Sequence, residues 1–328
     1  MNNIFEKFNS LNVLIIGDVM IDSYIWGKVD RISPEAPVPV VRVTKKEDRL
    51  GGAANVALNI QSLGATPLIC AVVGDDYDGE NFLSLLKSQG LSDQGILKIG
   101  TRPTTVKTRI IAHNQQIVRV DAETESNLNE SDSALVFEKI KQIISGNKID
   151  AIIFEDYDKG LITENLISQT VNLAQSKGII TVIDPKKRNF NSYKGVDLFK
   201  PNLKELKEGL KIDLDPKNIE QVKKAVEDLK TLLGAKSVML TLSENGVYIS
   251  SEKENKHILA HKRDIADVSG AGDTVIATAA LCLAAGLDEL KTAEIANLAG
   301  GLVCEHVGVV PIDKGKLMRE AGKLGGFW

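Results

Sequence analysis

Short apolar runs alternate with amphipathic segments along most of this chain, and no other feature constrains its fold as strongly. The apolar runs cover residues 12–16, 66–73, 151–154, 179–183 and 237–242. The segments between them have the period of helices that cover a buried surface, at residues 53–63, 77–89, 131–144, 163–176 and 218–233. Runs without polar alternation are typical of parallel strands that are buried on both faces. We therefore predict an α/β fold in which helices cover a mostly parallel central sheet.

Two segments interrupt this alternation and predict a second, smaller sheet. Residues 38–43 and 104–120 have the pattern of extended strands without an intervening helix, and the second contains a polar turn at 113–115 that is typical of a hairpin. We expect a β-sheet lid built from segments at about 22–45 and 102–121. Because no linker, repeat or low-complexity segment divides the chain, we predict a single domain over residues 1–328.

The composition narrows the partners of the chain. A formal net charge of -4 gives no basic surface for nucleic acid and no polybasic segment for a membrane, so we expect neither partner. Residues 1–11 lack the apolar centre of a signal peptide. Cysteines 70, 282 and 304 lie far apart in apolar surroundings, which favours reduced thiols in a cytoplasmic protein. The histidines form no H-E-x-x-H pattern, so we do not expect a zinc hydrolase.

A glycine-rich turn carries the strongest chemical signal. Gly270-Ala271-Gly272-Asp273 precedes a long apolar segment of helical composition. Small residues let the backbone approach a ligand, and the free N–H groups at the start of a helix bind anions. A carboxylate at Asp273 could accept a proton from an attacking hydroxyl beside such an anion site. The alternative is that Asp273 only caps the helix, and a motif this short does not separate the two.

Further motifs in the same order resemble one enzyme family. Gly51-Gly52-Ala53-Ala54-Asn55-Val56-Ala57 looks like the N-terminal signature of the ribokinase-like (PfkB) sugar kinases, and residues 267–274 look like their C-terminal signature. The resemblance runs from about residue 12 to residue 312, whereas a G-x-x-x-x-G-K-[ST] loop is absent. It implies a three-layer sandwich with a β-lid, ATP and Mg²⁺ as cofactors, and Asp273 as the base. The N–H groups of Gly270, Ala271 and Gly272 would then stabilise the transferred phosphoryl group.

The resemblance also implies where the sugar binds. Gly51 and Gly52 offer backbone without side chains, and Asn55 offers a donor and an acceptor for hydroxyl groups. The family places an acidic residue after the first strand on the sugar. We assign this role first to Asp18 and second to Asp22, which we expect to flank a turn. The alternatives are an ordinary strand-to-helix turn and solvated loop acids.

For the nucleotide, Pro201-Asn202-Leu203-Lys204-Glu205 resembles the family's N-x-x-E element, in which Glu205 would hold Mg²⁺ through water. A capping box formed by Asn202 and Glu205 is compatible with this role. Asp267 and Ser269 resemble positions that bind a potassium-like ion. The positions that the resemblance assigns to the nucleotide are Asp184, Lys186, Asn202, Glu205, Thr241, Ser243, Gly246 and Asn297.

A second set of motifs resembles a subgroup, the heptose-7-phosphate kinases. It comprises residues 26–40, 107–109, 114–121, 155–160 and 183–186, and it places Asp156 at the substrate. The implied reaction is phosphorylation of O1 of D-glycero-D-manno-heptose 7-phosphate, for ADP-heptose biosynthesis. Three cations of the predicted hairpin could hold the phosphate that this sugar already carries, unless they are merely solvated: Lys107, Arg109 and Arg119. Asp158 and Lys187 depart from the subgroup, which usually has glycine there.

Other functions stay open at this stage. The chain could be a PfkB-type kinase for another sugar, sugar phosphate or nucleoside, or a ligand-binding sensor without catalysis. The chain contains no H-x-G-H nucleotidyltransferase motif, so we expect a separate nucleotidyltransferase in the pathway. We also expect a homodimer through the lid, because apolar strands at 38–43 and 110–120 would otherwise be uncovered.

Overall fold

Strands with almost wholly buried side chains form the centre of the protein. The computed structural model describes residues 4–113, 115–261 and 263–324. The strands of the larger sheet are β1 (Asn12–Gly17), β4 (Thr66–Gly74), β5 (Ile96–Ile99), β8 (Ala151–Glu155), β9 (Ile180–Asp184), β10 (Leu198–Phe199), β11 (Ser237–Thr241), β12 (Val247–Ser250) and β13 (Asn255–Ile258). Their order is β13-β12-β11-β10-β9-β8-β1-β4-β5. All neighbouring pairs from β5 to β11 are parallel, and β12 and β13 add an antiparallel edge.

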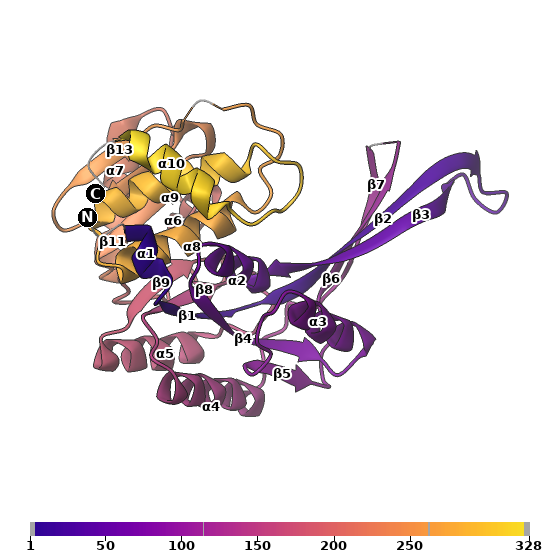
Figure 1. The fold of residues 1–328 in the computed structure, drawn as a ribbon, viewed down its shortest axis with the longest axis horizontal. Helices are drawn as coiled ribbons and strands as arrows, with labels where there is room; N and C mark the ends of the chain where they lie inside the picture. Colours follow the sequence, from indigo (N-terminus) through magenta and orange to yellow (C-terminus); the bar gives the residue numbers. More distant parts are fainter. Residues whose placement is uncertain (1–3, 114, 262, 325–328) are drawn as a thin grey trace.

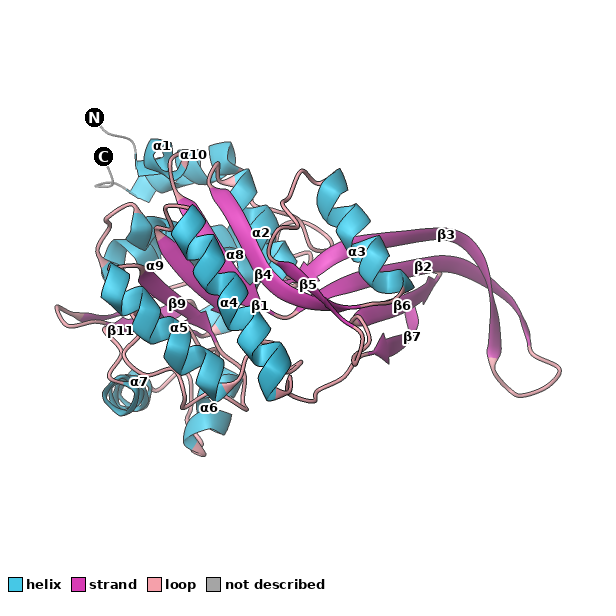
Figure 2. Cartoon of the chain, turned by 90° about the horizontal axis from the view of Figure 1, so that it is seen from below, coloured by secondary structure: helices cyan, strands magenta, loops and turns pink. Residues whose placement is uncertain are grey.

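Helices cover both faces of this sheet and complete three layers (Figures 1 and 2). One layer contains α2 (Ala53–Ser62), α8 (Ala271–Ala284) and α9 (Glu289–Val303), and α4 (Glu130–Gly146) and α5 (Glu164–Lys177) lie across the opposite face. The other helical segments are α1 (Ile4–Phe8), α3 (Tyr77–Ser88), α6 (Leu203–Leu210), α7 (Ile219–Leu233), α10 (Lys314–Leu324) and a 3₁₀ turn, η1 (Ser243–Asn245). The strands and helices predicted from the apolar pattern are confirmed, with ends shifted by a residue or two.

The carboxyl ends of the parallel strands gather polar side chains at one edge of the sheet. Gly17, Glu155 and Asp184 stand side by side there, because they close β1, β8 and β9 in register. In open α/β sheets, ligands bind outside this edge. The helices α2 and α8 also begin there, since α2 follows Gly52 directly and α8 packs on β8 and β9.

A second sheet of order β3-β2-β6-β7 forms the lid. Its strands are β2 (Val19–Ile32), β3 (Pro39–Gly52), β6 (Val106–Ala112) and β7 (Gln115–Ala122), and the β2–β3 ribbon projects well beyond the body (Figure 1).

The predicted hairpin is confirmed as β6–β7, although Asn114 in its turn lies outside the described residues. The prediction that Asp18 and Asp22 flank a turn is wrong. The chain pairs with β3 and β6 from Val19 onward and forms one continuous strand there, so Asp22 belongs to β2.

The two faces of the lid differ in character. The register aligns Asp22 with Lys107 and Arg49, so these polar side chains share the face toward the body. The other face carries large apolar side chains that are exposed, including Val118 and Val120. An apolar sheet face of this kind is normally covered by a partner.

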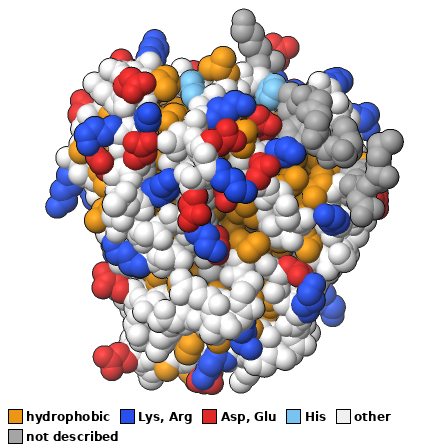
Figure 3. Space-filling model, turned by 90° about the vertical axis from the view of Figure 1, so that its left-hand side faces the viewer, with side chains coloured by type: hydrophobic (Ala, Val, Ile, Leu, Met, Phe, Trp, Pro, Cys, Tyr) orange, Lys and Arg blue, Asp and Glu red, His pale blue; other side chains and the backbone are white. Residues whose placement is uncertain are grey.

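The rest of the surface gives less information about function. Basic and acidic side chains are interspersed on the face shown in Figure 3. Searching the described residues finds no helix that is long and apolar enough to cross a membrane. Cys70, Cys282 and Cys304 are buried and unpaired by disulfide bonds.

Candidate active site

Asp273 lies in the first turn of α8 but does not cap it. The N-cap is Gly270, whose positive φ of 77° is a conformation that glycine adopts without strain, and no side-chain cap bond is present. The Asp273 carboxylate instead accepts hydrogen bonds from Asn55 Nδ2 at 2.5 Å and from the Tyr157 hydroxyl at 3.2 Å. These donors come from α2 and from the loop after β8. The structure therefore does not support the helix-cap alternative.

The surroundings of Asp273 give it the proton affinity of a base that works near neutral pH. Burial raises the pKa of Asp273 to about 6, and the charge of Asp184 acts in the same direction. The hydrogen bonds from Asn55 and Tyr157 and the charge of Lys200 oppose this rise. A general base is most efficient when its pKa lies near the working pH.

An anion site adjoins this carboxylate. The Ala271 N–H donates to the Val268 carbonyl at 3.3 Å, whereas those of Gly272 and Asp273 have no acceptor among the described residues, and the helix dipole makes this end partly positive. Gly272 leaves space on its open side: a Cβ atom there would lie 3.8 Å from both Lys200 Nζ and Asp184 Oδ2. Lys200 is only 2% exposed and pairs with Asp184 at 2.7 Å. A phosphate group at the helix terminus would thus have a buried lysine beside it.

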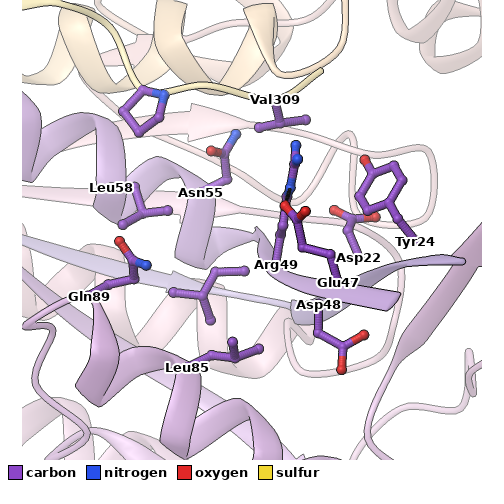
Figure 4. Close-up of a pocket in the computed structure, with 12 residues that line it drawn as sticks. Asp22, Tyr24, Glu47, Asp48, Arg49, Asn55, Leu58, Leu85, Gln89 and Val309 are labelled. Atoms are coloured by element: carbon purple, nitrogen blue, oxygen red, sulfur yellow. Dashed lines mark hydrogen bonds and ion pairs between the residues drawn. The ribbon is translucent and has the colours of Figure 1, made fainter. Parts of the chain in front are cut away.

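A pocket of about 280 Å³ opens between the lid and α2 (Figure 4), and its wall residue Asn55 bonds to Asp273. Asp22 and Asn55 line it, as do four residues of β3 that were not predicted from the sequence, among them Glu47 and Arg49. Asn55 is 2% exposed, and its Oδ1 is buried without a hydrogen-bond partner among the described residues. This oxygen can accept a hydrogen bond from a ligand hydroxyl, while Nδ2 of the same side chain holds Asp273.

Gly51 and Gly52, which we assigned to the sugar from the sequence, determine how closely β3 approaches β2 beside this pocket. Gly52 has a positive φ of 61° and ends β3 directly before α2. A side chain at Gly51 would collide with Asp22, and one at Gly52 would collide with the carbonyl of Asp18. The absence of side chains therefore allows β3 to lie against the start of β2, which places Asp22 in the pocket wall.

Asp18 and Asp156 hold the loop after β8. The Asp18 carboxylate accepts backbone N–H bonds from Tyr157 at 3.0 Å, Lys159 at 3.0 Å and Leu161 at 3.3 Å. Asp156 is 1% exposed and accepts bonds from the Tyr193 hydroxyl and Asn189, and burial raises its pKa to about 6. Both carboxylates are thus occupied in fixing the loop that carries Tyr157.

Asp158, which departs from the subgroup pattern, lies in the same loop. Its φ of 57° is in the left-handed region, where glycine would be free of strain. Its Oδ1 atom is buried without a partner in the part of the chain that the structure describes. The usual glycine at this position is therefore explained by backbone conformation.

Further charged side chains lie between the Lys200–Asp184 pair and α6. Asn202 caps α6 and forms the expected capping box with Glu205, with both bonds at 2.9 Å. The second Glu205 oxygen accepts a bond from Lys186. Glu155 is 1% exposed, and its Oε2 has no partner among residues with described positions. Burial raises the pKa of Glu155 well above its usual value, and the charges of Asp184 and Asp273 add to this effect.

These acids fit a magnesium ion that is held mainly by a nucleotide. Within the described residues, no three His, Cys, Asp or Glu side chains converge to hold a metal by themselves. Mg²⁺ usually keeps several waters and binds through one or two carboxylates together with substrate phosphates. The unpartnered Oε2 of Glu155, beside Asp184, is a donor of this kind. Glu155 could have been identified from the sequence, because it directly follows an apolar run and so ends a parallel strand.

The other residues assigned to the nucleotide lie at the end of β11, in the turn that follows it and within α9. Thr241 ends β11 and bridges to Asn202. Ser243 has a φ of 53°, in the left-handed region that glycine adopts without strain, and Gly246 ends the same turn. Asn297 donates to the Leu259 carbonyl at 2.9 Å. Asp267, which we assigned to a monovalent cation with Ser269, accepts N–H bonds from Ser269 and Gly308.

The three lid cations each have acidic partners. Lys107 pairs with Glu123 at 2.9 Å and with Asp121 at 3.4 Å, and Arg119 pairs with Asp121 at 2.9 Å. Arg109 donates to Asp22 at the pocket wall. The structure thus brings only Arg109 of the three directly to a pocket residue.

A buried carboxylate beside a helix N-terminus, next to a polar pocket, is compatible with phosphoryl transfer. Residues 10–314 match the model of the pfkB family carbohydrate kinases, and the chain belongs to this family. It is an ATP-dependent carbohydrate kinase.

The chain is also similar in sequence to proteins called bifunctional protein HldE. The protein from Pelobacter propionicus is 39% identical over 94% of this chain, and the one from Helicobacter pylori strain J99 is 40% identical over 90%. The aligned part covers 62% and 63% of those two proteins, so the chain spans about three-fifths of their length.

Solved structures confirm the ribokinase-like fold. Phosphofructokinase-2 from Escherichia coli, in complex with potassium, superposes with a TM-score of 0.76 at 19% identity, covering 96% of this chain and 98% of that one. Ribokinase from Arabidopsis thaliana, complexed with ribose and ATP, gives a TM-score of 0.71 at 17% identity, covering 94% and 99%.

The hydrogen bonds of Asp18 predict a role in stability. We expect Asp18→Asn to lower the free energy of unfolding by about 2–3 kcal/mol, because an amide group would face three backbone donors. Chemical denaturation measures this change. Asp150→Asn is the control, since Asp150 accepts one backbone bond, from Asn12, and should cost about 1 kcal/mol. Unchanged stability of Asp18→Asn with a raised KM for the sugar would instead make Asp18 a substrate ligand.

Proposed function

We propose that this chain transfers the γ-phosphoryl group of ATP to O1 of D-glycero-D-manno-heptose 7-phosphate. The product would be the 1,7-bisphosphate, an intermediate of ADP-heptose biosynthesis. The observation that carries the proposal is the Asp273 carboxylate, held by Asn55 and Tyr157 at the N-terminus of α8. The similarity to the HldE proteins and the subgroup motifs in the lid and in the loop after β8 support the heptose substrate.

In the proposed reaction, Asp273 takes the proton of the 1-hydroxyl as its oxygen attacks the γ-phosphorus. A new oxygen–phosphorus bond forms, the bond from the γ-phosphorus to the bridging oxygen breaks, and ADP leaves with that electron pair. The N–H groups of Gly270 and Gly272, and that of Ala271 on leaving the Val268 carbonyl, would stabilise the charge on the equatorial oxygens. Lys200, beside Gly272, would add a fixed positive charge.

On the nucleotide side, Glu205 would hold Mg²⁺ through water, with Glu155 and Asp184 as the nearby carboxylates. The ion, when bound, neutralises the phosphate oxygens. On the sugar side, Asp22 and the free Oδ1 of Asn55 would bind hydroxyl groups and align the sugar for attack. The proposed potassium-like ion at Asp267 and Ser269 stays a prediction.

The base role of Asp273 predicts the effect of its removal. We expect Asp273→Asn to lower kcat by about 10²–10⁴-fold while leaving the affinity for Mg-ATP nearly unchanged. In the unmodified enzyme, kcat/KM should fall as the pH decreases through about 6, because a protonated Asp273 cannot accept the hydroxyl proton. Steady-state kinetics across pH measure both effects. Near-normal turnover of the Asn variant would reject the mechanism.

Tyr157→Phe is the matched control for this pH dependence. The Tyr157 hydroxyl donates to Asp273 and lowers its pKa, so its loss should move the acid limb of the profile to higher pH. An acid limb that stays in place in the Phe variant would mean that another group controls it.

A substrate panel tests the sugar. With Mg-ATP we expect the highest kcat/KM for D-glycero-D-manno-heptose 7-phosphate, compared with fructose 1-phosphate, fructose 6-phosphate, ribose and adenosine. Phosphorus NMR of the product should show a new phosphate on the anomeric oxygen. A preference for ribose or adenosine would contradict the heptose assignment and favour the alternative of another PfkB-type kinase.

We also propose a homodimer through the apolar face of the lid, since Val118 and Val120 are 45% and 53% exposed there. Light scattering at micromolar concentration should give twice the mass of one chain. Val120→Lys should convert the dimer to a monomer, whereas Leu135→Lys, on exposed α4, should not. A monomeric unmodified protein would remove the proposal.

The pathway context gives two further proposals. We propose a cytoplasmic enzyme, because its three cysteines are free and its nucleotide substrate is an intracellular compound. The separate nucleotidyltransferase stays a prediction, and an assay of the purified protein for nucleotidyl transfer to the sugar 1-phosphate tests it.

A further inference from the structure

We propose that Arg49, together with Arg109, binds the phosphate that the sugar already carries and so selects a phosphorylated substrate. This inference rests on the proposed function, and it assigns the task to a residue of β3 rather than to Lys107 and Arg119. Four observations support it: the position of Arg49, its free donors, its neighbour Arg109, and the occupied state of the other lid cations.

Arg49 belongs to the lid strand β3 and lies in the wall of the pocket. It is paired with Asp22 in the β2–β3 register and lines the pocket with Asn55 and Val309 (Figure 4). A Cβ atom on Gly308 would lie 3.2 Å from Arg49 Nη1, so the guanidinium group reaches the segment after α9. Asn55, in the same pocket, bonds to Asp273. A ligand that contacts Arg49 and Asn55 therefore spans from a fixed cation to the base.

Most of the hydrogen-bonding capacity of Arg49 is unused. Its Nε donates to Glu47 at 2.5 Å, whereas its two terminal nitrogens have no acceptor among the residues that the structure describes. The side chain is 36% exposed, so these donors face the open pocket. A guanidinium fork with free terminal nitrogens matches two oxygens of a phosphate group.

Arg109 supplies a second cation from the neighbouring strand. The guanidinium carbons of Arg49 and Arg109 lie 5.0 Å and 5.3 Å from the centre of the Tyr24 ring. Because β2 runs between β3 and β6, the Tyr24 ring contacts one arginine from each neighbouring strand and helps to position both side chains. Arg109 donates through Nη1 to Asp22, and its Nη2 has no acceptor in the described chain.

Lys107 and Arg119 are less suited to this task. Lys107 is held by two carboxylates, Glu123 and Asp121. Arg119 uses both Nε and Nη2 on Asp121. Binding a phosphate with either residue would first require breaking these ion pairs, whereas the terminal nitrogens of Arg49 are available without rearrangement.

The test compares one sugar with and without its phosphate. For Arg49→Gln we expect kcat/KM for D-glycero-D-manno-heptose 7-phosphate to fall by about 10–100-fold, since hydrogen bonds between charged groups are lost. For D-glycero-D-manno-heptose the change should stay within about 3-fold. Arg49→Lys, which keeps the charge but not the fork, should lie between the two. Arg42→Gln is the control, because Arg42 pairs with Asp30 on the exposed ribbon and should behave like the unmodified enzyme.

Two outcomes would overturn the inference. Equal losses for both sugars in Arg49→Gln would indicate a structural role, and an unchanged kcat/KM for both sugars would show that the phosphate binds elsewhere. Calorimetric binding of the sugar phosphate, together with the thermal midpoint of each variant, separates lost binding from lost folding. If the unmodified enzyme itself does not prefer the phosphorylated heptose, the proposed function fails before this inference is tested.

Discussion

The hydrogen bond from Asn55 to Asp273 is the contact on which the rest of the site depends. It joins the first turns of α2 and α8, although the two residues are 218 positions apart in the chain. Both helices follow a glycine with positive φ, which turns the backbone sharply at the sheet edge. Because this one amide holds the carboxylate and keeps Oδ1 free, the pocket and the phosphate site are fixed relative to each other.

Much of this arrangement could be predicted from the sequence. The apolar runs predicted buried strands, and the amphipathic segments between them predicted helical connections, which favour parallel pairing of the strands. The turn at residues 270–273 made Asp273 a candidate base, and the family motifs elsewhere in the chain favoured that role over a helix cap. The same logic identifies Glu155 and Asp184, which end adjacent strands, once the strand order is known.

Other residues could not be placed without the three-dimensional pairing. Asp18 and Asp22 are both acids after the first apolar run, and only the start of β2 at Val19 separates a loop-fixing residue from a pocket residue. Arg49 enters the pocket because β3 pairs with β2 over the length of the ribbon. Likewise, the sequence contains the charges of Lys107 and Glu123 but not their contact, since long-range strand register decides it.

The β2–β3 ribbon has one further consequence. The same strands that hold Asp22 and Arg49 at their base continue for 14 residues each, to a tip far from the body. At about 3.3 Å per residue, such a strand is roughly 46 Å long, so it acts as a lever arm. A rotation of about 5° where the sugar binds displaces the far end by about 4 Å over this length. Any rotation of the ribbon about its base would therefore be magnified at its tip.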